Sequence, residues 1–124
     1  TWMHQNKADY TNTFCYLMNE KIKEDKIYSN QGFISWKQQW QERLKLHNNS
    51  TEKSLKLMRS TNPLVIPRNH KVEEALDAAN KDNLNPINNL LKILEKPYEN
   101  QKGISEYQSP APASDQKYQT FCGT

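Results

Sequence analysis

The chain has 124 residues, the length of a single domain of ordinary size, and carries a formal net charge of +3. Hydrophobic residues make up 35% of it, below the roughly 45–50% of typical globular proteins, which argues against a large core of its own. Two cysteines and three glycines exclude a disulfide-rich scaffold, a four-cysteine zinc site and a glycine-rich phosphate loop in this stretch.

Charge and hydropathy also limit the expected partners and location. The net charge is too small to predict nucleic-acid binding, and no apolar run approaches the ~20 residues of a membrane span. No apolar signal segment is visible, so we expect a cytoplasmic protein that binds neither nucleic acid nor a membrane. The first residues, Thr1-Trp2-Met3, are unlike a natural N-terminus, which leads us to expect a piece of a longer protein.

Apolar residues recur at helical spacing along most of the chain. This spacing predicts an all-α fold of about five helices joined by short loops. The expected helices span about residues 9–28, 33–47, 50–60, 70–81 and 85–96.

Polar residues precede three of the expected helices and predict their caps. Asn49 can cap the third helix, and either Asn69 or His70 the fourth. Asn85-Pro86 combines a capping residue with a proline at the first helical position, a strong start for the fifth helix.

The pattern changes after Pro97. Prolines, serines and glutamines dominate there without a period, which predicts an extended Pro-rich tail. We therefore divide the chain into a helical region, residues 1–97, and a tail, residues 98–124, that ends in Cys-Gly-Thr. Four aromatic residues are expected to pin the tail along a surface: Tyr98, Tyr107, Tyr118 and Phe121.

Several side chains have both an ordinary and a functional interpretation. Cys15 lies near the apolar stripe of the first helix, which favours a small core residue. Trp36 and Trp40, four residues apart, are more typical of a core stripe than of a stacking platform for single-stranded nucleic acid. His70 and Glu74 share one helix face, where a surface pair is favoured over half of a metal site.

An apolar connector bracketed by prolines joins the third and fourth expected helices. Arg68 has a planar guanidinium that can clamp a carboxylate or phosphate, and Asn62 is a turn former. The alternative, which the residues favour, is that Asn62, Pro63, Arg68 and Asn69 simply fix a loop between helices. No catalytic triad, paired-carboxylate site or metal cluster is supported, so we assign no catalytic or metal-binding residue to this chain.

Cys122 lies third from the end of the sequence. A cysteine at an exposed end can react as a thiolate, and the alternative is an inert residue on a tail. A disulfide between Cys15 and Cys122 stays open, because nothing in the sequence requires it.

The segment from Met58 to His70, Met-Arg-Ser-Thr-Asn-Pro-Leu-Val-Ile-Pro-Arg-Asn-His, resembles a signature of the selenoprotein O family. The resemblance continues through a helix like that of Val72 to Ala79, a Leu-rich helix ending in Pro97-Tyr98, and a terminal Cys-x-x at Cys122. It covers roughly residues 33–124, with order and spacing in agreement. The sequence departs from the family at Pro67, where many relatives have leucine, and at His70, where an aromatic residue is common, which suggests a distinct bacterial branch.

The resemblance implies a much longer protein with a kinase-like fold that transfers AMP from ATP to hydroxyl side chains of proteins. ATP and a divalent metal such as Mg²⁺ would bind upstream, so this chain would hold no cofactor. Its partners would be that missing kinase-like region and the protein substrates. Cys122 matches the position that is selenocysteine in animal members, which makes it a candidate for redox control of the enzyme. The alternative is an autonomous helical module that recruits other proteins and has no catalytic activity.

Overall fold

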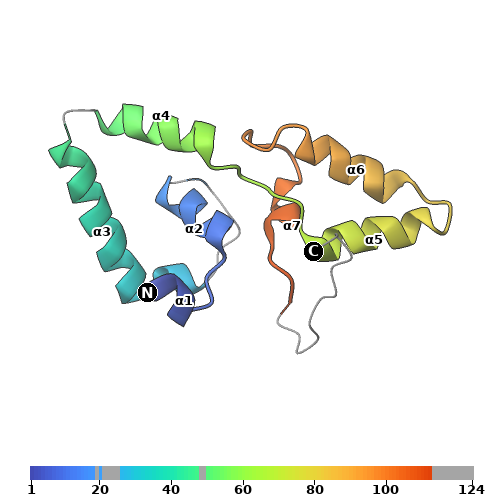
Figure 1. Ribbon diagram of the computed structural model, residues 1–124, viewed down its shortest axis with the longest axis horizontal. Helices are drawn as coiled ribbons and strands as arrows, with labels where there is room; N and C mark the ends of the chain where they lie inside the picture. The colour runs from blue at the N-terminus through green and yellow to red at the C-terminus, as the bar shows by residue number, and fades with distance from the viewer. Residues whose placement is uncertain (19, 21–25, 48–49, 113–124) are drawn as a thin grey trace, which may run out of the picture. The chain divides into compact units, whose positions relative to one another are not determined.

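A computed structural model describes residues 1–18, 20, 26–47 and 50–112 of the chain (Figure 1). Over these residues the chain forms seven α-helices and one 3-10 helix, with no strand, which confirms the all-α prediction. The backbone divides into two compact units, Thr1–Leu64 and Val65–Thr124. The boundary that we predicted between residues 97 and 98 separates a helical sequence pattern from a Pro-rich one. That boundary stays a prediction. No helix in the described part of the chain is long and apolar enough to span a membrane.

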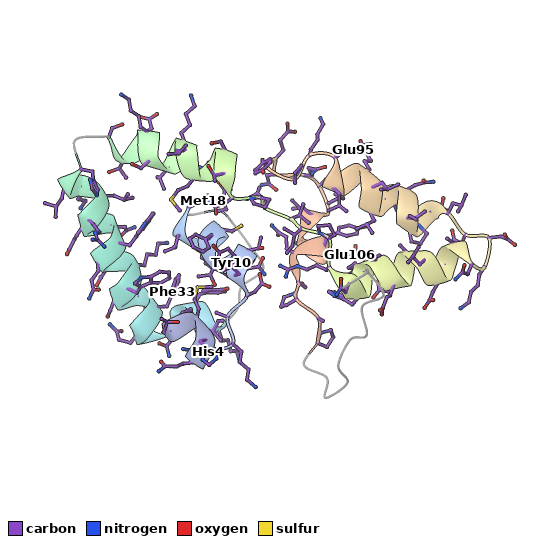
Figure 2. All side chains as sticks on the ribbon, viewed as in Figure 1. His4, Tyr10, Met18, Phe33, Glu95 and Glu106 are labelled. Carbon is purple, nitrogen blue, oxygen red and sulfur yellow. The ribbon has the colours of Figure 1, made fainter. Side chains whose placement is uncertain are left out.

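The first unit holds four α-helices and the 3-10 helix. They are α1 (Trp2–Gln5), α2 (Tyr10–Leu17), η1 (Lys26–Ser29), α3 (Gln31–Leu46) and α4 (Thr51–Thr61). Its core is built around Leu17, Tyr28 and Phe33, with the tryptophans of α1 and α3 packed against it. Phe33 projects from α3 toward the first two helices (Figure 2) and lies 5.0 Å from the Trp2 ring, centroid to centroid.

The core placement settles two of the side-chain interpretations. Trp36 and Trp40 are partly buried against the aromatic core, as expected for a core stripe. Cys15 is 0% exposed, and its Sγ donates to the Pro63 carbonyl oxygen at 3.6 Å, so it is a small core residue as predicted.

The single helix predicted over residues 9–28 is wrong. The α2 helix begins after Asp9, whose carboxylate accepts from the Asn12 backbone N–H at 2.9 Å, and ends at Leu17. In one continuous helix Tyr16 and Tyr28 would lie about 18 Å apart along the axis, at 1.5 Å per residue. Their rings instead stack with centroids 3.9 Å apart, and the Tyr28 hydroxyl lies 3.1 Å from the Thr13 hydroxyl. The positions of these two tyrosines are therefore incompatible with one helix through both.

The second unit is an antiparallel pair of helices with a short third one beside it (Figure 1). The pair consists of α5 (Asn69–Ala79) and α6 (Asn85–Leu94), and the third helix is α7 (Ile104–Gln108). Ala75, Leu90, Ile93 and Ile104 are its buried apolar residues, together with Val65 at its start. The tail was predicted without periodic structure, so α7 is an element that the sequence pattern missed.

The predicted caps are each displaced by one or two residues. Ser50 caps α4 through its Oγ, which accepts from the Lys53 N–H at 3.2 Å, while Asn49 lies outside the described residues. Arg68 stands at the cap position of α5 in an extended conformation, without a side-chain cap bond, so neither Asn69 nor His70 is the cap. Leu84 occupies the cap position of α6, which puts Asn85 and Pro86 inside its first turn.

Candidate functional site

The loop between α4 and α5, residues 62–68, lies in the segment that resembles the selenoprotein O family, and we call it the family-like loop. Its start belongs to the first unit and its end to the second. At its start, the side-chain amide of Asn62 donates to the Met58 carbonyl oxygen at 3.0 Å and closes the last turn of α4. Pro63 supplies the carbonyl that accepts from Cys15. Leu64, which follows and is the last residue of the first unit, is buried. This end of the loop therefore anchors the first unit.

At the other end of the loop, Arg68 holds α7. Its Nη2 donates to the main-chain oxygen of Gln108 at 3.1 Å, a contact between residues 40 apart in sequence. Gln108 is only 3% exposed, so the bond is made in a largely dehydrated place. The guanidinium that the sequence offered as a clamp for an anion is here engaged with a backbone carbonyl. Asn69, the next residue, is the first residue of α5 and is exposed.

One turn further along α5, Lys71 makes a second link to α7. Its Nζ lies 3.0 Å from Glu74 Oε2 and 3.7 Å from Glu106 Oε1 on α7. The hydrogen bond with Glu74, aided by the negative charges of both glutamates, raises the pKa of Lys71 above its ordinary value. An amine held in its protonated form is a poor nucleophile and a poor base near neutral pH. Lys71 is therefore arranged to hold charge, not to react.

A hollow of about 300 Å³ lies beside this ion-pair cluster. We call it the α5–α7 hollow; it is lined by Lys71, Glu74, Ala75, Pro86, Asn89, Leu90, Glu106 and Tyr107. A neighbouring hollow of about 360 Å³ shares Asn89, Glu106 and Tyr107 with it. Among the described residues there is no group of three or more His, Cys, Asp or Glu side chains that could hold a metal ion. The half-site considered for His70 and Glu74 gains no third ligand in that part of the chain.

Another lysine with a shifted pKa lies in the first unit. Lys37 on α3 donates through Nζ to the Tyr16 main-chain oxygen at 3.0 Å. Partial burial lowers its pKa because the charged form loses hydration. Its ammonium joins α3 to α2, so its perturbation also has a structural cause.

Several contacts that build this region were not singled out from the sequence. Gln101 donates through Nε2 to the carbonyl oxygens of Ile93 at 2.9 Å and Lys96 at 2.8 Å, and so closes the end of α6. Glu106 and Gln108 lie on a helix too short to show a period. The spacing of Lys71 and Glu74, three apart on one helix, was the only local signal for the cluster.

The redox candidate Cys122 lies outside the described residues, as do Tyr118 and Phe121 of the aromatic set expected to pin the tail. Of the other two, Tyr98 is exposed and Tyr107 is half-buried. The buried residues that fix residues 104–108 are instead Ile104 and Gln108.

Comparison with known proteins places the chain clearly. The family model described as protein adenylyltransferase SelO matches residues 1–95. Among curated proteins, the protein nucleotidyltransferase YdiU of Pelagibacter ubique is 55% identical over 123 residues, which cover 99% of this chain and 26% of that protein. The proteins of the same name from Alcanivorax borkumensis and Syntrophotalea carbinolica are each 45% identical over 125 residues, covering 100% of this chain and 26% and 25% of their own lengths. The chain thus spans about a quarter of the length of these relatives.

Proposed function

Because the chain belongs to the SelO family of protein adenylyltransferases, we propose that the complete protein transfers AMP from ATP to hydroxyl side chains of other proteins. The observation that carries this proposal is the 55% identity to a protein nucleotidyltransferase over 123 residues, together with the family match. ATP and a divalent metal ion such as Mg²⁺ are its expected cofactors, held by a kinase-like region outside residues 1–124.

Within that enzyme we assign residues 1–124 a structural and regulatory role. Three polar side chains of the loop and of α5 support this role, since each is bound to the fold. Arg68 binds the Gln108 carbonyl, and Asn62 closes α4. Lys71 is held protonated between two carboxylates. Side chains bonded in this way hold helices in place. We therefore expect the residues that carry out AMP transfer to lie outside residues 1–124.

The regulatory part of the proposal concerns Cys122. Its thiolate would attack a disulfide of an oxidised small thiol such as glutathione disulfide, releasing one reduced thiol and forming a mixed disulfide. A second cysteine thiolate of the enzyme would then displace the other thiol and leave an internal disulfide. The support is the family resemblance at the end of the sequence. In the complete enzyme, Cys122→Ser should remove the difference in activity between oxidising and reducing buffer. An unchanged difference in that variant would rule out this control.

The transfer itself is tested with two labelled forms of ATP. The complete protein is incubated with Mg²⁺, acceptor proteins, and ATP that carries its label at either the α- or the γ-phosphate. AMP transfer puts the label into protein only from the α-phosphate. Label arriving only from the γ-phosphate would mean phosphorylation and would overturn the proposal, as would no incorporation from either form.

A further inference from the structure

The α5 helix has one side toward α7 and one side away from it. Lys71 and Glu74 line the α5–α7 hollow and mark the near side. At about 100° per residue, Leu76 lies about 140° around the helix from Lys71 and about 160° from Glu74. Leu76 is therefore on the far side, and it is 49% exposed.

The α6 helix repeats this arrangement. Pro86 and Asn89 line the same hollow, and Leu91 lies about 140° and about 160° around the helix from them. Leu84 precedes Leu91 by seven residues, or nearly two full turns, and so shares its side within about 20°. Leu84 is 58% exposed and Leu91 is 55% exposed.

These residues make one apolar surface, the leucine face, defined by Leu76, Leu84 and Leu91. A single exposed leucine is ordinary on a protein surface. Three on one side of a two-helix hairpin, with half-buried Ile87 between two of them in sequence, form the kind of patch that marks an interface. The opposite side of the hairpin already has its cover in α7, through Lys71 and Glu106.

We propose that the leucine face packs against the part of the same polypeptide that lies outside residues 1–124. The matched relatives are about four times as long as this chain, so the rest of a polypeptide of that length would offer a large surface covalently linked to the leucine face. A tethered partner needs little contact area, because its effective concentration is high. A stable dimer of two separate copies typically buries roughly 800 Å² on each partner, more than three half-exposed leucines supply. This inference rests on the proposed function only in taking the chain as part of a longer enzyme.

The test compares adjacent positions, about 100° apart around one helix, in the complete protein. Leu91→Cys and the matched control Lys92→Cys, which is exposed on α6, are each treated with a maleimide, and the native cysteines are corrected with the unsubstituted protein. A covered leucine face predicts that Leu91→Cys reacts at least about tenfold more slowly than Lys92→Cys, since burial hinders the thiolate. Equal rates would overturn the proposal. Leu76→Cys against Asp77→Cys repeats the test on α5, in case Leu91→Cys does not fold.

A photo-reactive benzophenone amino acid at position 84 then identifies what covers the face. We expect cross-linked peptides from outside residues 1–124 within monomeric protein. Cross-links to residues 1–64, or a cross-linked dimer, would overturn the assigned occupant. Neither measurement reads nucleotide transfer. An enzyme that labels as expected but transfers no AMP would count against the proposed function alone, and the reverse result against this inference alone.

Discussion

Replacing Phe33 tests the aromatic core of the first unit most directly. Phe33 is 3% exposed and packs its ring against Trp2, Tyr28 and Trp36 at centroid distances of 5.0, 5.1 and 5.9 Å. Truncating a buried phenylalanine to alanine costs about 3–5 kcal/mol of unfolding free energy, through lost transfer energy and the cavity left behind. Phe33→Leu keeps most of the volume and loses mainly the ring pairs, a cost of about 1–1.5 kcal/mol.

Urea unfolding followed by tryptophan fluorescence measures this loss of unfolding free energy in the first unit, Thr1–Leu64. All three tryptophans of residues 1–124 lie in the first unit, so the emission of this chain reports on that unit. With a slope of about 1 kcal/mol per molar urea for a unit of this size, Phe33→Leu should lower the midpoint by about 1 M. Phe33→Ala should lower it by about 3 M or unfold the unit in buffer. Leu46→Ala on the same helix, at a residue 84% exposed, is the control and should shift the midpoint by less than about 0.5 M. If Phe33→Ala matched this control, the assigned core would be wrong.

Three further predictions concern the second unit. Arg68→Met should speed amide hydrogen exchange in residues 104–108, because the guanidinium bond to α7 is lost; Asn69→Ala, at an exposed neighbour, should not. Lys71 has a raised folded-state pKa, so its stabilising effect is complete below the ordinary value of 10.5 and is lost as pH rises through the folded value. Stability measured up to pH 11 should fall less steeply in Lys71→Gln, and an unchanged slope would contradict the assignment. Gln101→Ala removes the side-chain amide that bonds the Ile93 and Lys96 carbonyls at the end of α6, and it should raise exchange there while leaving α5 unaffected.

The longer helices could be predicted because each carries its own apolar stripe. The spacing that predicted helices near residues 33–47, 50–60 and 70–81 corresponds to α3, α4 and α5 within about two residues. At α4 and α5 the caps shifted because neighbouring polar residues compete for the same position, whereas at α6 the apolar Leu84 occupies it. At α5 the competition is decided by Arg68, whose side chain reaches Gln108 instead of capping its own helix.

The two larger misses have a common physical cause. The break within residues 9–28 follows from the stacking of Tyr16 on Tyr28, and α7 follows from its links to Arg68 and Lys71. These contacts join residues far apart in the chain, so no local pattern reports them. A five-residue helix in a Pro- and Ser-rich stretch is too short to stand without such contacts.

The anchoring of α7 limits how the proposed redox control can work. Gln108 is fixed by Arg68, and Cys122 follows it by 122 − 108 = 14 residues. Even a fully extended chain of that length spans at most about 50 Å, at roughly 3.3–3.6 Å per residue. Peptide mapping of the oxidised enzyme should therefore find Cys122 joined to a cysteine within about 50 Å of Gln108. A partner farther away would require α7 to leave α5, and faster hydrogen exchange in residues 104–108 of the oxidised enzyme would report that release.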